Sequence, residues 1–197
     1  MGRSDLSSRA DEFIDNLEAK IARRLRIGPM ETYVSGAFTA DSPTIALPTG
    51  FVEMRSFVFD VSTDEPRKLE YITPEQGDAL ALSSSGVPDF YSVVGGVIRL
   101  YPTPDAAYTY TIRHFARFVP LSATNTTNAL LASYPDLYLY GCLLEACGYV
   151  GDDARIPLWK AAVDEAYAEI ARADKRARHK PPVVLLDPAL PGMMARS

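Results

Sequence analysis

The sequence predicts an α+β protein: a small helical bundle with an inserted antiparallel β-rich region and an extended C-terminal tail. Three observations predict it. Apolar residues recur at helical spacing in residues 8–29 and 130–179, the helical body. Residues 30–129 between them, the β-rich insert, consist of β-prone runs separated by glycine and proline turns. Residues 180–197 are rich in proline and glycine, which favours an extended tail.

Composition restricts the functional classes. The chain has 197 residues, of which 47% are hydrophobic and 23% charged, as in an ordinary folded protein of one domain or at most two. A net charge of −5 disfavours a free-standing binder of nucleic acid or membrane surfaces. Two cysteines are too few for a disulfide scaffold, and we find neither a signal-peptide core nor an apolar run of about 18–20 residues. We therefore expect a protein made in the cytoplasm, without a membrane partner.

The first element is predicted to be a helix from Ser8 to Ile27. Ser7 or Ser8 can cap its start, and Gly28-Pro29 is expected to stop it. The positions that form a single apolar stripe along this helix are Phe13, Ile14, Leu17, Ile21 and Leu25.

Strands are predicted in the insert at Tyr33–Phe38 and Phe51–Val61, with a short edge strand at Ile45–Leu47. Residues Leu69–Leu82 are ambiguous. A short helix can begin there at Thr73, with Pro74 in its first position.

A hairpin is predicted over Phe90–Tyr101, because Gly95-Gly96 suits a two-residue turn. This register pairs Ser92 with Arg99 on one face. The residues predicted to share the other face, which is expected to be the core face, are Tyr91, Val93, Ile98 and Leu100.

A long strand follows at Tyr108–Phe118, with His114 in its apolar phase. That phase favours a hydrogen-bonded core histidine over a catalytic base.

Two further helices complete the predicted body. One begins near Ser133, where Asp136 completes a pattern like a capping box. It is apolar nearly all round over Leu137–Val150, which predicts a buried central helix ended by Gly148 and Gly151.

The last helix is predicted to be capped by Asp152 or Asp153, with Pro157 in its first turn. Its apolar positions have the spacing of a helix packed lengthwise on another, and Trp159 is expected to be buried. They are Trp159, Val163, Ala166, Ile170 and Ala173.

No catalytic, metal-ligating or cofactor-binding constellation is evident, so no enzyme activity and no cofactor are predicted. Phosphate-binding loops, dinucleotide fingerprints and nucleophile elbows are missing. The histidines His114 and His179 are far apart in the sequence. On one helix, Cys142 and Cys147 would point roughly 140° apart, which indicates core cysteines rather than a metal site.

Several segments, in order and spacing, resemble the head-to-tail adaptor (connector) proteins of tailed bacteriophages and of gene transfer agents. The resemblance covers about residues 8–178. The segments are the hairpin Val93–Pro104, the stretch Phe118–Ser122, the run Tyr134–Gly141 and the helix start Asp153–Trp159.

The resemblance implies a structural ring, usually of twelve copies, beneath the portal of a filled capsid. Its partners would be further copies of itself, the portal protein, a tail nozzle or tail-tube protein, and double-stranded DNA that passes through the lumen without sequence-specific binding. Its place would be the virion neck, after assembly in the host cytoplasm. The tail residues expected to dock on the portal are Pro181, Val183, Val184, Leu185, Leu186 and Leu190. Packing of the tail on its own domain, or disorder, are the alternatives.

Charge fits such a ring, because twelve copies would carry about −60 and carboxylates in the lumen would repel DNA phosphates. The candidate lumen acids are Asp164, Glu165 and Glu169, which could equally be ordinary solvated residues. The candidate basic contacts with the portal or with DNA are Lys175, Arg176, Arg178 and Lys180, although complementarity to the helix dipole also explains them.

Three alternatives stay open. One is a tail-tube gatekeeper ring of the same tail. Another is a small-molecule or sugar-binding domain that uses a tyrosine-rich surface, although such tyrosines are more often core or interface residues. The tyrosines concerned are Tyr91, Tyr101, Tyr108 and Tyr110. The third is an enzyme with an unrecognised site.

Overall fold

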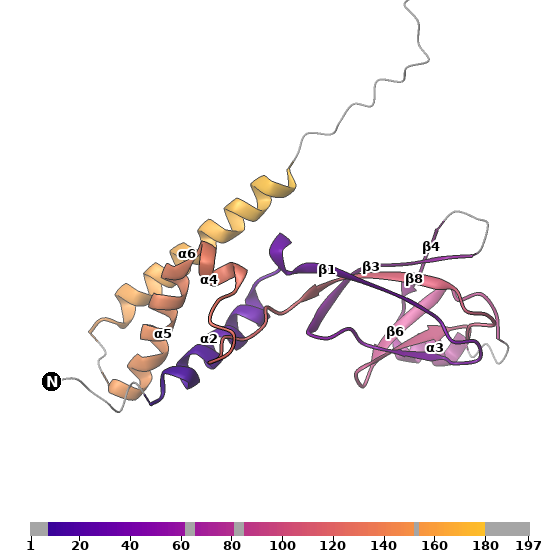
Figure 1. Ribbon diagram of the computed structural model, residues 1–197, viewed down its shortest axis with the longest axis horizontal. Coiled ribbons are helices and arrows are strands. Elements are labelled where there is room, and N and C mark those ends of the chain that lie inside the picture. The colour runs from indigo at the N-terminus through magenta and orange to yellow at the C-terminus, as the bar shows by residue number, and fades with distance from the viewer. Residues whose placement is uncertain (1–7, 62–65, 81–84, 152–153, 180–197) are drawn as a thin grey trace, which may run out of the picture.

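The computed structural model describes residues 8–61, 66–80, 85–151 and 154–179. Figure 1 shows an elongated molecule with most of its helices at one end and the strands at the other. This confirms the predicted α+β fold class, in which a β-rich region is inserted between an N-terminal helix and two C-terminal helices. The domain boundaries remain predictions, and residues 180–197 lie outside the described residues.

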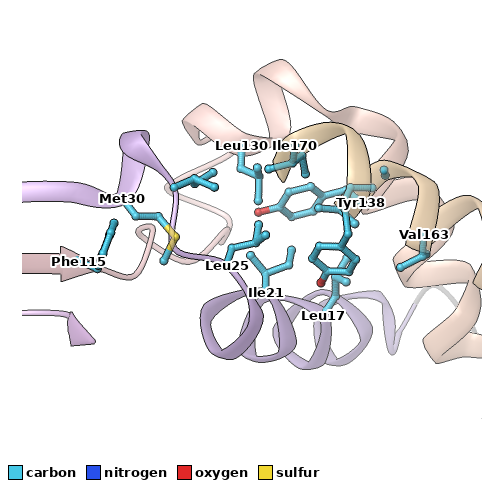
Figure 2. Packing of buried hydrophobic residues seen from close by; sticks show 13 residues of the cluster. Leu17, Ile21, Leu25, Met30, Phe115, Leu130, Tyr138, Val163 and Ile170 are labelled. Atoms are coloured by element: carbon cyan, nitrogen blue, oxygen red, sulfur yellow. The ribbon is translucent and has the colours of Figure 1, made fainter. Parts of the chain in front are cut away.

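The helical body is built from four helices around one core. They are α2 (Ala10–Arg24), α4 (Ala129–Ser133), α5 (Pro135–Val150) and α6 (Ile156–Arg178). Figure 2 shows that Leu17 and Ile21 of α2 converge with Tyr138 of α5 and Ile170 of α6. Their exposed fractions, 5% at most, mark them as core residues.

The core of the helical body extends toward the strands through Met30 and Phe115 (Figure 2). Both are buried, although Phe115 lies on the strand phase that the sequence analysis did not assign to a core. The helices and strands therefore share one packed junction.

Helix α2 is shorter than the prediction of Ser8–Ile27. Its N-cap is Arg9, which makes no side-chain capping hydrogen bond, so the predicted cap at Ser8 is wrong; Ser7 lies outside the described residues. The helix ends at Arg24, with Leu25 as its C-cap, before the predicted stop at Gly28. Leu25 is extended and, like the predicted stripe residues Phe13, Leu17 and Ile21, buried, so tertiary packing ends the helix earlier than glycine and proline would.

The helix predicted to begin near Ser133 is α5, which begins at Pro135. Its N-cap is Tyr134, so the predicted capping pair of Ser133 and Asp136 is wrong, and a separate short helix, α4, precedes it. Asn128 caps α4, because its side-chain oxygen accepts hydrogen bonds from the backbone N–H groups of Leu130 (3.1 Å) and Leu131 (2.8 Å). Ser133 is the last residue of α4. Tyr134 interrupts the helix, because a residue that precedes a proline disfavours the helical conformation.

Helix α5 ends at Gly151 in the left-handed conformation (φ 69°), as predicted, whereas Gly148 lies within the helix. Pro157 lies in the first turn of α6, also as predicted. The caps predicted at Asp152 or Asp153 lie outside the described residues. On α6 the predicted positions Val163, Ala166 and Ile170 are buried, but Trp159 is only half-buried, because it lies near the exposed start of the helix.

The strands form two sheets with the orders β1-β8-β3-β4 and β2-β7-β6-β5. Every pair is antiparallel except β5 with β6, which is parallel. The strands of the first sheet are β1 (Glu31–Ala37), β3 (Phe51–Asp60), β4 (Arg67–Lys68) and β8 (Thr109–Ala116). Those of the second are β2 (Thr44–Ala46), β5 (Glu70–Tyr71), β6 (Phe90–Val94) and β7 (Val97–Tyr101).

The predicted hairpin register is confirmed, since Ser92 pairs with Arg99 across β6 and β7. The predicted core face is confirmed as well, with Ile98 completely buried. Ser92 is nevertheless buried on the opposite face, where its hydroxyl lies 3.2 Å from the Tyr101 hydroxyl. The short helix that the ambiguous segment allowed is present as α3 (Pro74–Leu80), and it packs on this hairpin.

Aromatic side chains form the core between the sheets. Phe38 packs within 6.0 Å of Phe57 and within 5.5 Å of Phe59, measured between ring centroids. Both strands β3 and β8 contribute, and Ile112 of β8 completes the cluster. This core is separate from the core of the helical body.

None of the helices in the described ranges combines the length and apolar character that a bilayer-spanning segment needs.

Candidate functional site

Helix α5 is not buried all round, and this corrects the prediction of a buried central helix. One side packs on α2 and α6, with Leu137 completely buried. The opposite side is apolar and at least partly accessible, and the described contact at its C-terminal end is that of the Arg9 guanidinium, 4.4 Å from the centroid of the Tyr149 ring. We call this side the outward face of α5, and its members are Leu139, Leu143, Ala146 and Tyr149, spaced four, three and three residues apart.

The outward face of α5 exposes large apolar side chains to solvent. Leu139 is 57% exposed and Tyr149 is 47% exposed. The charged residues described on α5 are Asp136 in the first turn and Glu145, which pairs with Lys20 of α2. A helix face without charge is typical of a surface that another protein covers.

Glu18 of α2 holds together several segments of the helical body. Its carboxylate accepts hydrogen bonds from the Leu121 backbone N–H (3.1 Å), the Asn128 side-chain amide (3.2 Å) and the Tyr138 hydroxyl (3.1 Å). Burial raises the pKa of Tyr138 well above its ordinary value, so the hydroxyl remains a donor. One carboxylate therefore ties the connection between β8 and α4 to α2 and α5.

The candidate lumen acids are in different environments. Asp164 accepts from the guanidinium of Arg24 at 3.1 Å, and Arg24 also stacks on the ring of Tyr167, 3.9 Å from its centroid. Asp164 thus serves to join α6 to α2. Glu165 and Glu169 are exposed one helical turn apart, on the side of α6 that faces away from the core.

The candidate basic contacts also differ in their environments. Lys175 and Arg176 are exposed on the last turn of α6. Arg178 instead binds Asp174 at 2.7 Å and lies 3.9 Å from Glu31 of β1, so it links α6 to the sheet. Lys180 and the candidate docking residues lie outside the described residues. Those docking residues are Pro181, Val183, Val184, Leu185, Leu186 and Leu190.

The tyrosines of the sugar-binding alternative are largely inside the β-rich region. Tyr91 is 7% exposed and Tyr101 is 5% exposed. Tyr110 stacks on Phe38 at 5.1 Å between centroids, and Tyr108 packs edge-on against Phe59. These rings do not form an open stacking platform.

His114 is buried, as predicted, but the predicted hydrogen bond is wrong. Its ring stacks on Phe51 at 5.6 Å, and neither ring nitrogen has a hydrogen-bond partner among the described residues. Burial lowers the pKa of His114, so the neutral form is favoured. The ring acts as an apolar filler between β3 and β8.

The described residues hold no group of three or more His, Cys, Asp and Glu side chains placed to bind a metal ion. Cys142 and Cys147 are not joined in a disulfide, and burial raises the pKa of Cys142 to about 11, which suits a core residue and not a nucleophile at neutral pH.

Two features escaped the sequence analysis. The exposure of Leu139 depends on how many helices cover α5, which periodicity does not tell. Arg172 lies one turn before Arg176 and is exposed; its spacing of three and four residues from Lys175 and Arg176 was a signal that could have grouped it with them.

Comparison with protein families identifies the family of the chain. The family model described as SU10 adaptor protein matches residues 1–185, most of the chain. No curated protein matches the chain.

Proposed function

The chain belongs to the SU10 adaptor protein family of phage head–tail adaptors, and we propose that it forms a ring beneath the portal, joins capsid to tail and lets DNA pass through its lumen. Membership makes it a structural protein of the virion neck that interacts with other head and tail proteins. The ring, its place under the portal and the passage of DNA are the proposed parts.

The outward face of α5 is the observation that carries the proposed ring. A single copy leaves Leu139 and Tyr149 exposed on an uncharged helix face. In a closed ring each copy contacts its neighbour through two different surfaces, so this face of one copy would be covered by another surface of the next. We propose twelve copies, the usual number in the head-to-tail adaptor rings that the sequence resembles.

The elongated shape supports separate roles for the two ends of the molecule. The strands lie at the end of the molecule opposite most of the helices (Figure 1). We assign the helical body to the ring and the β-rich region to contact with a tail nozzle or tail-tube protein. Glu165 and Glu169 are the proposed lumen acids, because the charge of Asp164 is already matched by Arg24.

Mass photometry tests the position of the ring. The purified chain is measured alone, with portal rings of its own phage, and with tail tubes. A defined ring that forms on the portal supports the adaptor. Binding to tail tubes without binding to portals would favour the gatekeeper alternative, and binding to neither would contradict both.

Portal docking by residues 181–197 rests on their apolar and proline-rich sequence. Deleting them is expected to leave the melting temperature within about 2 °C of the full chain, since the described body holds its own core, and to weaken attachment to portals. Calorimetry and pelleting with portal rings measure the two effects. A large loss of thermal stability would mean instead that the tail packs on its own domain.

A further inference from the structure

Four basic side chains form a continuous line at the end of α6. They follow one another by three, one and three residues, which places them along one helix face over about 10 Å. We call them the basic stripe, and they are Arg172, Lys175, Arg176 and His179, which line one shallow hollow.

The basic stripe does not hold the fold together. All four side chains are exposed, and none forms an ion pair with another described residue. Neighbouring arginines behave differently. Arg24 pairs with Asp164, and Arg178 pairs with Asp174 and Glu31. Glu169, three residues before Arg172, is an acidic neighbour of the stripe on α6, but no ion pair joins the two.

The helix dipole explains only part of this stripe. Its effect is confined to the last turn, which holds Lys175 and Arg176. Arg172 lies a turn earlier, and at a spacing of four residues from Arg176 the two like charges repel each other. A gathering of cations that costs the isolated chain stability points to an anionic partner.

The surroundings of the stripe indicate what kind of anion it meets. On the described part of α6, the exposed large apolar side chain is Leu158, which lies at the end of the helix opposite to the stripe. The stripe therefore has no exposed large apolar residue of α6 beside it. Protein interfaces usually have an apolar or aromatic centre, whereas a phosphate backbone is bound by cationic and polar groups and needs no apolar centre. A contact between the stripes of two neighbouring copies fits poorly, because neighbours in a ring of more than two copies meet through different surfaces.

We propose that the basic stripe contacts the phosphate backbone of duplex DNA without reading its sequence. This inference rests on the proposed function, because the lumen of the ring is where DNA would meet the chain. Glu165 and Glu169 lie on the same side of α6 as Arg172 and Arg176, at steps of four, three and four residues. DNA that passes along this helix would meet a repelling acidic band and then an attracting basic band near the end of α6.

The test is a titration of the isotope-labelled full chain with a 12-base-pair DNA duplex, followed by NMR at several salt concentrations. We expect amide shifts confined to the last two turns of α6. Three permanent cations predict that the logarithm of the binding constant falls with the logarithm of salt concentration with a slope of about −2.7.

The variant Arg172→Gln/Arg176→Gln should bind the DNA duplex about tenfold more weakly at low salt. Its salt dependence should have a slope of about −0.9, because one permanent cation remains. The matched control is Arg113→Gln/Arg117→Gln, which removes the same charge from two exposed arginines of the β-rich region. The control should bind DNA as the unmodified chain does.

Shifts that fall elsewhere, no shifts at low salt, or equal weakening by both variants would each overturn the inference. A poly-glutamate peptide of equal charge is the second probe, and equal or tighter binding of it to the same turns would identify an acidic protein surface as the partner instead. A chain that forms rings on portals but does not bind DNA overturns only this inference. A chain that binds DNA through the stripe but ignores portals overturns only the proposed function.

Discussion

The helical body and the β-rich region solve the same packing problem in different ways. The β-rich region encloses an aromatic core between two sheets, and its exposed apolar residues are scattered over separate elements. Those residues are Tyr33, Val34, Tyr71, Leu80 and Val94. The helical body has a mainly aliphatic core and leaves Leu158 of α6 exposed, but its exposed residues on α5, Leu139 and Tyr149, share a single helix face. Scattered apolar residues are ordinary on a protein surface, whereas a gathered set indicates an interface.

Polar groups differ between the two regions as well. The helical body uses partly buried or interhelical charges, above all Glu18 with its three donors and Arg24 with Asp164. The β-rich region relies on strand ladders and ring contacts. The comparison teaches that the β-rich region keeps its exposed apolar residues on several elements, while the helical body gathers Leu139 and Tyr149 on one face of α5, the face that the proposed ring would cover.

The largest expected effect breaks the aromatic core. Phe57→Ala should lower the free energy of unfolding by about 3–5 kcal/mol, because Phe57 is fully buried and packs on Phe38, Tyr91 and Tyr110. Urea denaturation of the single copy measures it. Tyr33→Ala, at a residue 72% exposed, is the control and should change the value by less than about 0.5 kcal/mol. Similar effects of both would contradict a core closed within one copy.

A smaller effect is expected from the polar tie in the helical body. Glu18→Ala should cost about 2 kcal/mol, because it leaves the Tyr138 hydroxyl and the Leu121 N–H without their acceptor. Asp15→Ala removes an exposed carboxylate from the same helix and should cost less than about 0.5 kcal/mol. Equal urea midpoints for the two variants would show that Glu18 is an ordinary surface acid.

The smallest stability effect concerns His114 at the junction of the two regions. Burial lowers its pKa in the folded chain, so its contribution is complete above the unfolded value of about 6.5 and is lost as pH falls through the folded pKa. His114→Leu replaces two unpartnered nitrogens with apolar atoms and should leave stability at pH 7.5 unchanged or slightly higher. Melting temperatures from pH 7.5 to 5 should fall less steeply in the variant; parallel curves would contradict this.

Structure that depends on neighbouring residues was predicted well from the sequence. Burial that depends on elements distant in the sequence was not. The hairpin register followed from two adjacent glycines and from strand alternation, both local properties. The cap at Asn128 was missed because Ser133 offered an equally good local pattern, and Pro135 decided between them by breaking the helix at Tyr134.

The candidate site shows the same limit. Glu165 and Glu169 could be placed on an outer helix face by periodicity, but the pairing of Asp164 with Arg24 joins residues 140 positions apart. Whether an apolar helix is buried depends on the number of elements around it. The apolar sequence of α5 does not reveal that Leu139 is 57% exposed on one side while Leu137 is completely buried on the other.

The most direct test of this account is the assembly of one matched pair of variants on portal rings, measured by mass photometry. Leu139→Asp places a charge on the outward face of α5, and Leu80→Asp places the same charge on a residue 45% exposed at the end of α3. We predict that both variants fold with nearly unchanged melting temperatures, and that only Leu139→Asp fails to form the ring. Rings of normal mass from Leu139→Asp would contradict the claim that a neighbouring copy covers this face.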